Sequence, residues 1–213
     1  MLKANKKTLI VASIVTVLPI LIGVFFWDRL PDMMATHFGT NNQADGFSNK
    51  PLAVFGIPFL CLAALWLGAA VTANDPRKQN ISPKMFSLGL WIAPLISLIT
   101  AAIMYAVNLG AAVDVTYVGG LIMGLLLIIL GNYAPKARQN YTIGIKLPWT
   151  LADEENWNRT HRFAGYLWMI CGILLIVLTL FRVLHAGWMV AFIAVSVLLP
   201  FGYSFWLHAG KGL

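Results

Sequence analysis

Six long apolar segments alternate with shorter polar segments along this chain, and no Lys or Arg interrupts an apolar segment. A membrane-spanning helix needs about 20 mostly apolar residues, with a usable range of about 17–25. The short alternating segments of a membrane β-barrel are absent, and lipid offers the backbone no partners, which favours helices. We therefore predict an all-α polytopic membrane protein, a bundle of six transmembrane helices at residues 9–27, 51–71, 86–107, 113–130, 163–181 and 188–207.

The composition agrees with this class. Of 213 residues, 59% are hydrophobic and only 11% are charged, whereas average globular chains carry about 25% charged residues. These values exclude a disordered chain, a collagen-like chain and a small disulfide scaffold, and they argue against an ordinary soluble domain. The net charge of +7 raises the question of nucleic acid. A soluble nucleic-acid-binding protein would need its basic residues reachable on one surface, so we expect no direct nucleic-acid binding.

The polar segments differ in their content of Lys and Arg. Twelve of the 15 basic residues lie in the amino-terminal segment, the second and fourth loops and the carboxyl terminus, and the other three are Arg29, Lys50 and Arg182. Cytoplasmic loops of membrane proteins carry an excess of Lys and Arg. We therefore expect both termini in the cytoplasm, the loop at residues 28–50 outside, and the loop at residues 131–162 inside.

The amino-terminal segment has an alternative interpretation as a signal peptide, because three lysines precede an apolar run. That run is about 19 residues long, which exceeds the usual apolar region of about 7–15 residues, so we expect a retained first helix. No repeat or low-complexity segment divides the chain. We expect one membrane domain over residues 1–213, made of a two-helix module at 1–71 and a four-helix region at 72–213.

The outer loop has the pattern of an ordered hairpin. Residues 34–38 can form an extended piece, residues 39–46 are rich in turn formers, and Asp45-Gly46 is a strong turn signal. Ser48 or Asn49 can cap the second helix.

Such a hairpin would bring His37 close to Asp45. The pair can serve as a ligand, proton or metal site, or His37 can simply hydrogen-bond its own hairpin. Two candidate ligands do not define a metal site, so we predict no metal.

The inner loop predicts a helix end followed by a new helix. Gly131-Asn132 can end the fourth helix, because glycine readily takes the left-handed cap conformation. Thr150 is a good N-cap for a short interfacial helix that leads into the fifth span. Three acidic residues follow in the first turn, where the helix dipole favours them. Glu155 and Arg159 have the spacing of an i,i+4 ion pair.

The residues of the inner loop leave three interpretations open: structure with lipid anchoring, a protein docking surface, or catalysis by Glu154 and His161, which would share a helical face. The sequence contains no HExxH, no GxSxG and no Gly-rich phosphate motif. We therefore assign no catalytic residue and no cofactor.

Small side chains inside the apolar segments have packing roles. Gly119, Gly120 and Gly124 can permit close helix packing. Cys61 and Cys171 lie in apolar helices, where free Cys behaves as a small hydrophobe. Without a CxxC motif, neither a zinc site nor a redox pair is indicated.

Two stretches resemble a known family. Residues 131–151, followed by Trp157, Thr160-His161-Arg162 and Gly165, resemble the signature of the SdpI immunity-protein family. The stretch with Leu30-Pro31, His37-Phe38-Gly39, Asp45-Gly46 and Lys50 is similar to the module that often precedes it. The resemblance extends from about residue 8 to residue 180. The chain departs from the family pattern at Lys146-Leu147, where Arg-Thr is common, and Lys cannot replace the bidentate contacts of Arg.

The resemblance implies a bacterial plasma-membrane protein that protects its producer from an extracellular peptide toxin. As in the best-known member of the family, it also implies that the toxin-engaged protein holds a cytoplasmic repressor at the membrane. Two other hypotheses stay open from the residues: a small transporter or exporter of peptide or lipid, and a membrane-embedded metal-dependent enzyme. The expected partners are therefore the lipid bilayer, a peptide toxin and a repressor protein.

The candidate site residues form two sets. The toxin-side set is Pro31, His37, Gly39, Asp45, Gly46 and Lys50. The cytoplasmic set, which would dock a partner or hold the bundle, is Asn132, Lys136, Arg138, Asn140, Gly144, Lys146, Pro148, Trp149, Thr150, Trp157, Thr160 and His161.

Overall fold

The computed structural model describes residues 1–39 and 42–212. Within these residues, six helical segments are long and apolar enough to cross a membrane, which confirms the predicted fold class. They are Lys3–Phe25, Leu52–Ala73, Pro83–Asn108, Val115–Lys136, Glu154–Leu180 and Gly187–Lys211. The described residues also contain one sheet, which has two strands.

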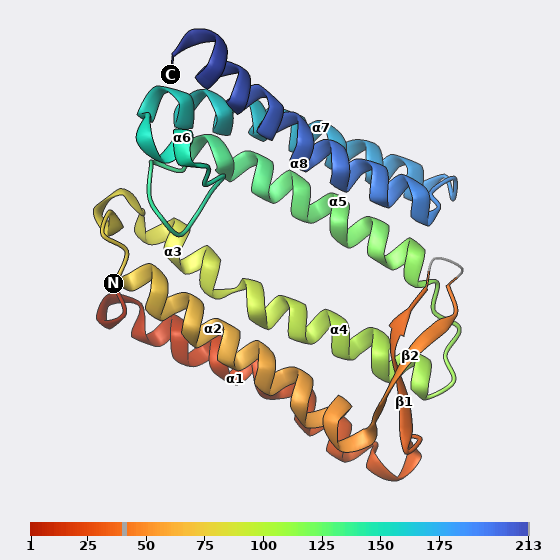
Figure 1. Cartoon of the computed structure of the whole chain (residues 1–213). Coiled ribbons are helices and arrows are strands. Elements are labelled where there is room, and N and C mark those ends of the chain that lie inside the picture. Colours follow the sequence, from red (N-terminus) through yellow and green to blue (C-terminus); the bar gives the residue numbers. More distant parts are fainter. Residues whose placement is uncertain (40–41, 213) are drawn as a thin grey trace. The chain divides into compact units, whose positions relative to one another are not determined.

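The α-helices, labelled as in Figure 1, are α1 Lys6–Phe25, α2 Ile57–Ala73, α3 Pro83–Leu90, α4 Ile92–Asn108, α5 Val115–Tyr133, α6 Pro148–Ala152, α7 Glu154–Leu180 and α8 Ala186–Lys211. A π-helical turn, Leu52–Gly56, precedes α2, and short 3-10 turns cover Lys3–Asn5, Trp27–Arg29, Lys78–Asn80 and Ala134–Lys136. The third span is therefore two helices, α3 and α4, which meet at Trp91.

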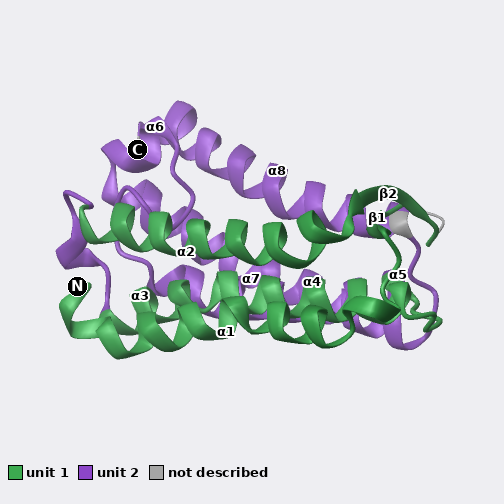
Figure 2. Ribbon diagram, turned by 90° about the horizontal axis from the view of Figure 1, so that it is seen from below, with its two compact units in different colours: residues 1–74, 83–115 green, residues 75–82, 116–213 purple. Residues whose placement is uncertain are grey.

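The chain forms two compact units (Figure 2). Unit 1 is Met1–Asn74 with Pro83–Val115, and unit 2 is Asp75–Ser82 with Thr116–Leu213. The short loop between α2 and α3 thus belongs to unit 2, although both of its flanking helices belong to unit 1.

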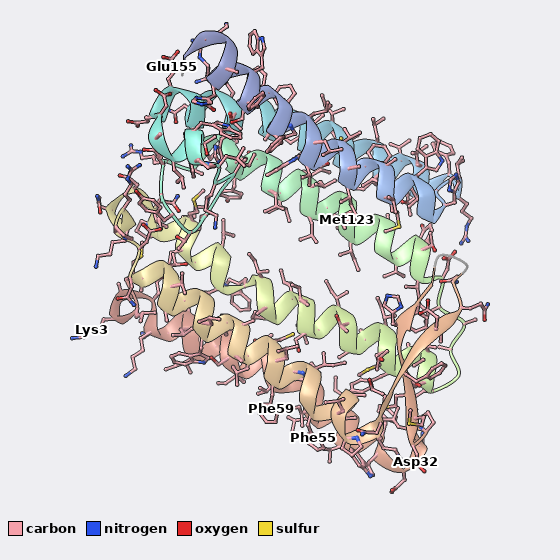
Figure 3. All side chains as sticks on the ribbon, viewed as in Figure 1. Lys3, Asp32, Phe55, Phe59, Met123 and Glu155 are labelled. Atoms are coloured by element: carbon pink, nitrogen blue, oxygen red, sulfur yellow. The ribbon has the colours of Figure 1, made fainter. Side chains whose placement is uncertain are left out.

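Unit 1 is built from α1, α2, α3 and α4, with the strands at one end. Lys3 and Asp32 mark opposite ends of this unit in Figure 3. Two hydrogen bonds join α1 to α4: the Ser97 hydroxyl donates to the Thr16 carbonyl at 2.7 Å, and the Tyr105 hydroxyl donates to the Pro19 carbonyl at 3.1 Å. In a lipid-exposed bundle such interhelical bonds and close packing, more than the hydrophobic effect, hold the helices together.

The strands β1 (Met33–Phe38) and β2 (Ala44–Asn49) form an antiparallel hairpin, as the sequence predicts. The expected Asp45-Gly46 turn is wrong, because both residues lie inside β2 and the chain turns earlier, where the Gly39 amide donates to the Gln43 carbonyl at 2.8 Å. Gly46 pairs with His37, and a Cβ there would lie 2.7 Å from the His37 Cβ. Gly46 therefore permits close strand approach instead of forming the turn.

The cap of the second span is Asn49, whose side-chain oxygen accepts from the Leu52 amide at 2.9 Å. This confirms one of the two predicted caps. A side-chain acceptor at this position satisfies an amide that has no partner within the helix.

Unit 2 contains α5, α7 and α8, and glycines bring α5 against α7. A Cβ on Gly124 would lie 2.8 Å from the Gly172 carbonyl oxygen, and a Cβ on Gly131 would lie 2.7 Å from that of Gly165. The two pairs are seven residues apart on both helices, so they recur on the same helix face.

Two expected helix boundaries in unit 2 are wrong. Gly131 does not end the fourth helix, because α5 continues to Tyr133 and Gly131 instead makes room for α7. Thr150 is not an N-cap: it lies in the third position of α6, and its hydroxyl accepts from the Leu147 amide at 2.8 Å. Asp153 caps α7 by accepting from the Asn156 amide at 2.6 Å. The expected interfacial helix and fifth span are therefore one helix, whose predicted Glu155–Arg159 ion pair is confirmed.

We predict that Gly124→Ala lowers the free energy of unfolding by about 1–3 kcal/mol, because its methyl group would overlap the Gly172 carbonyl in a packed interface. The thermal midpoint of the purified protein in detergent measures this loss. Gly119→Ala is the matched control, since its Cβ would meet only the Met189 Cε at 3.5 Å. An unchanged midpoint in Gly124→Ala would show that the glycine pairs do not hold α5 and α7 together.

Candidate functional site

The hairpin displays the His37–Asp45 pair to solvent. The Nδ1 atom of His37 lies 2.5 Å from Oδ1 of Asp45, and their side chains are 74% and 53% exposed. The structure thus brings this predicted pair together. Because Nδ1 is engaged by the carboxylate, the pair offers Nε2 of His37 and the second carboxylate oxygen of Asp45 to a ligand.

The hairpin is fixed to the rest of unit 1 by side-chain amides that pair with backbone groups. Asn108, the last residue of α4, accepts from the Ala35 amide at 2.9 Å and donates to the Ala35 carbonyl at 3.0 Å. The oxygen of the Asn42 side chain accepts from the Val115 amide at 2.8 Å. These side-chain amides pair with backbone groups, as the backbone of a neighbouring strand would. The hairpin is therefore held in one position against the helices.

Lys50, which we expected among the toxin-side residues, closes the base of the hairpin. Its ammonium donates to the Trp27 carbonyl at 3.2 Å, lies 3.1 Å from an Asp32 oxygen and sits 5.4 Å from the Trp27 ring centroid. The Lys50 side chain is only 11% exposed. Its contacts are therefore those of a residue that positions the hairpin. Pro31 lies just before β1, and Gly39 begins the turn.

The segment between α5 and α6, residues 134–147, is called the inner motif below, and Asn140 is at its centre. Asn140 is fully buried. Its side-chain nitrogen donates to the Arg138 and Ile143 carbonyls, and its oxygen accepts from the Thr142 and Ile143 amides. One side chain thus satisfies four backbone groups of an irregular loop, which fixes the loop's shape.

Helix α7 supplies the wall against which the inner motif packs. Trp157 is fully buried, and its indole nitrogen donates to the Ala137 carbonyl at 2.7 Å. His161 stacks on Trp157 with ring centroids 4.1 Å apart, and its Nε2 accepts from the Ile145 amide at 2.9 Å. Gly144 has a φ of 126°, and a Cβ there would lie 2.5 Å from Nε2 of His161. Only glycine fits this strained, crowded position.

His161 has both ring nitrogens engaged. Its Nδ1 lies 2.8 Å from the Trp157 carbonyl, which can only accept, while Nε2 accepts from a backbone amide. These bonds hold the ring in the neutral form with its proton on Nδ1. Glu154, the residue expected to share a catalytic face with His161, is exposed, whereas His161 is 1% exposed. Within residues 1–39 and 42–212, no three His, Cys, Asp or Glu residues lie close enough together to hold a metal ion.

The loop between α2 and α3 packs on the inner motif, although its sequence pattern indicates no site residue. Asp75 is 3% exposed, and its Oδ2 accepts from the Tyr141 amide at 2.9 Å and the Thr142 hydroxyl at 2.8 Å. Asn80 donates to the Gln139 carbonyl at 2.7 Å. Asn74-Asp75-Pro76 is a turn signal, but nothing local in the sequence points to partners 59 to 67 residues away.

A second set of contacts that the sequence pattern does not indicate joins α6 and α7 to α8. The Trp149 indole donates to the Ser204 hydroxyl at 2.7 Å, and the same hydroxyl donates to the Asn156 side chain at 2.9 Å. Thr160 donates to that Asn156 oxygen at 3.0 Å. Trp149 also stacks on His208, with ring centroids 5.6 Å apart. This network seats α6 and α7 on the carboxyl-terminal helix.

The members of the predicted cytoplasmic set differ in burial. Asn140, Thr150, Trp157, Thr160 and His161 are buried and form the scaffold. Trp149 is half-buried, and the exposed members are Asn132, Lys136, Arg138, Gly144, Lys146 and Pro148. The scaffold residues shape the inner motif, and the exposed basic side chains are the ones within reach of a partner.

Hydrogen bonds between loops agree with six alternating spans. Asn42, in the first loop, bonds Val115, at the end of the third loop, and Asp75, in the second loop, bonds Tyr141, in the fourth. In a six-span chain the first and third loops share one side of the membrane, and the second and fourth share the other. Both contacts obey this rule.

We predict that Asn140→Asp opens the inner motif, because a carboxylate would face the Arg138 and Ile143 carbonyls in place of the donating amide. An unsatisfied buried polar contact of this kind costs about 1–3 kcal/mol, which a lower thermal midpoint and faster proteolysis between residues 137 and 147 report. Asn132→Asp is the control, since Asn132 is exposed and its oxygen already accepts from Lys136. Equal behaviour of the two variants would contradict a scaffold role for Asn140.

Comparison with known proteins covers both regions of the site. Residues 136–204, which hold most of the inner motif, α6, α7 and the greater part of α8, match the SdpI/YfhL protein family. Residues 14–71, which hold the hairpin, match a domain of unknown function (DUF1648). The chain is also 30% identical to the immunity protein SdpI of Bacillus subtilis (strain 168) over 175 residues, 82% of this chain and 83% of that relative. No solved structure matches the chain.

The likeness to SdpI thus spans both units and agrees with the resemblance of the inner stretch and the outer loop to that family. With six helices able to cross a membrane, this multi-pass membrane protein belongs to the SdpI family.

Proposed function

We propose that this protein protects a bacterial cell against an extracellular antimicrobial peptide toxin. The observation that carries the proposal is the 30% identity to an immunity protein across 82% of this chain. The proposal places the protein in the plasma membrane with both termini and the inner motif in the cytoplasm, and with the hairpin outside. The excess of Lys and Arg in the terminal, second and fourth loop segments supports this orientation.

The hairpin is the part proposed to meet the toxin. Its seat on α4, through Asn108 and Ala35, presents it as a formed surface and not as a slack loop. A formed surface loses little conformational entropy when it binds. His37 and Asp45 supply polar groups on that surface, and Phe47, which belongs to the same strand as Asp45, supplies an exposed apolar side chain. A peptide with both apolar and polar faces matches this chemistry.

The inner motif is the part proposed to hold a cytoplasmic repressor when the toxin is engaged. Arg138 and Lys146 are exposed on a loop whose backbone is fixed by Asn140 and His161. A rigid loop that carries exposed cations supports recognition of an acidic protein surface through charge complementarity. The same side chains also suit anionic lipid headgroups, and charge reversal at an exposed cation outside the inner motif separates the two roles.

Expression of the chain in a sensitive bacterium is expected to raise the peptide concentration that halts growth, measured across a panel of membrane-active peptides. His37→Ala and Asp45→Ala should reduce this protection while the thermal midpoint stays unchanged, because both side chains are exposed. Asp28→Asn, an exposed carboxylate outside the hairpin, is the control. If cells with the wild-type chain stay as sensitive as cells with an empty vector, the proposed function is wrong.

The proposed binding of a repressor is tested with a fluorescent fusion of a repressor whose gene lies next to the gene of this protein. Toxin is expected to move the fusion from the cytoplasm to the membrane, and the double variant Arg138→Glu, Lys146→Glu should abolish that movement. Arg162→Glu, an exposed cation on α7 outside the inner motif, should not. Loss of movement in all charge-reversal variants alike would indicate a general effect of charge at the membrane surface instead of docking.

A further inference from the structure

The hairpin of β1 and β2 has two edges, and the edge of β1 already carries strand-like pairing. The amide and the carbonyl of Ala35 both bond the Asn108 side chain, so they point away from β2. In an antiparallel pair, opposite residues alternate between those that exchange backbone bonds with each other and those whose backbone groups point outward. Ala35 is of the second kind, and its partner across the ladder is Phe47. The backbone amide and carbonyl of Phe47 therefore point out from the opposite edge, that of β2.

A second bond fixes the same register at the base of the hairpin. The Lys50 amide donates to the Asp32 carbonyl at 2.9 Å, which makes these two residues a bonded pair. Met33 and Asn49 are the next pair along the ladder, so their backbone groups point outward. The outer edge of β2 thus presents the amides and carbonyls of Phe47 and Asn49, which have the two-residue spacing that an added strand pairs with.

The outer edge of β2 has no backbone partner among the residues that the structure describes. Within 1–39 and 42–212, no hydrogen bond outside the hairpin ladder reaches the backbone amide or carbonyl of Phe47 or Asn49. The strand Ala44–Asn49 contains neither Pro nor Lys, which are residues that commonly block pairing at an exposed strand edge. Phe47 is 57% exposed, so solvent reaches this part of the strand.

The charged side chains beside this edge select the kind of strand that fits. In the segment 30–50, the Asp, Glu, Lys and Arg residues are Asp32, Asp45 and Lys50. The side chains of Asp32 and Asp45 are 99% and 53% exposed, whereas that of Lys50 is 11% exposed. With His37 neutral, the charge that a partner can reach on the hairpin is therefore negative, which complements a cationic partner.

We propose that an extended, cationic segment of the peptide toxin binds as a third strand along the outer edge of β2. Its backbone exchanges hydrogen bonds with Phe47 and Asn49, which is the pairing by which peptides add to a sheet edge. Its cationic side chains lie on the exposed face that carries Asp45, and its apolar side chains lie on the half-buried face that carries Ala44 and Ser48. The inference rests on the proposed function, because it names how the hairpin holds the toxin.

The probe is a short synthetic peptide of alternating lysine and valine with blocked ends. It is titrated against the full-length protein in nanodiscs of neutral phosphatidylcholine, which removes attraction to anionic lipid. We expect the unmodified peptide to bind. An analogue methylated at two consecutive central amides should bind at least about tenfold more weakly, because methylation blocks hydrogen bonds on both edges of the peptide and keeps its charge. Absence of binding, or equal binding of the two peptides, overturns the proposal.

Hydrogen exchange at single-residue resolution locates the bound strand. Saturating peptide should slow exchange of the Phe47 and Asn49 amides several-fold and leave the Ser48 amide, which is paired with Met34 inside the hairpin, nearly unchanged. Slower exchange elsewhere in the chain but not at these two amides assigns the peptide to another surface and overturns the proposal. Protection of the two amides without peptide, seen only in discs that hold two copies, assigns the edge to a second copy and overturns it too.

The cationic preference is tested with a charge-neutralising variant. Asp45→Asn should weaken binding of the lysine peptide several-fold, because it removes the exposed carboxylate beside the edge. Asp28→Asn, which removes an exposed carboxylate outside the hairpin, should not. A peptide of alternating glutamate and valine should not bind the wild type. The cationic preference is wrong if Asp45→Asn binds the lysine peptide as tightly as Asp28→Asn does.

Protection of cells is scored separately. A wild-type chain that protects cells from a peptide toxin but binds no strand at β2 refutes this inference and leaves the proposed function standing. A chain that binds the strand at β2 but protects no cells does the reverse.

Discussion

Backbone N–H and C=O groups that leave a helix near lipid find little water, so each needs a partner within the protein. In this protein Asn and Asp side chains supply many of those partners. Asn108 serves the hairpin, Asn140 serves the inner motif, and Asp75 joins the second loop to that motif. An amide pairs with both a donor and an acceptor, whereas a carboxylate only accepts. The ordered loops at each end of the helices depend on this constraint.

Close helix packing supports the inner motif from the membrane side. The pairs Gly124 with Gly172 and Gly131 with Gly165 bring the backbones of α5 and α7 together. Gly131 lies only three residues before the inner motif, and Trp157 contacts the motif from α7. The helix contact and the loop are therefore parts of one structure, in which a change of spacing between α5 and α7 alters the seat of the loop.

The two functional regions differ in how they expose their chemistry. The hairpin places His37 and Asp45 on its surface, while Lys50 is buried at its base. At the inner motif the residues of the family signature are mostly buried. Trp157 and His161 of α7 are enclosed beneath it, whereas Arg138 and Lys146 are exposed. A long, specific sequence signature thus encodes mostly a fold, and the few exposed side chains carry what a partner can recognise.

The sequence by itself determined the features that depend on neighbours along the chain. Apolar length set the six spans, residue pattern set the hairpin that joins His37 to Asp45, and local spacing set the Glu155–Arg159 pair and narrowed the cap of the second span to Ser48 or Asn49. Each is decided within a few turns of chain, where propensity and spacing act directly.

Only the tertiary structure decided the roles that depend on distant partners. Gly131 has the local signals of a helix end, yet its contact with Gly165 makes it a packing residue inside α5. Asp75 has the local signals of a turn, yet its carboxylate bonds a residue 66 positions away. A glycine or a carboxylate is compatible with several local structures, and the buried group that it meets in the folded protein selects among them.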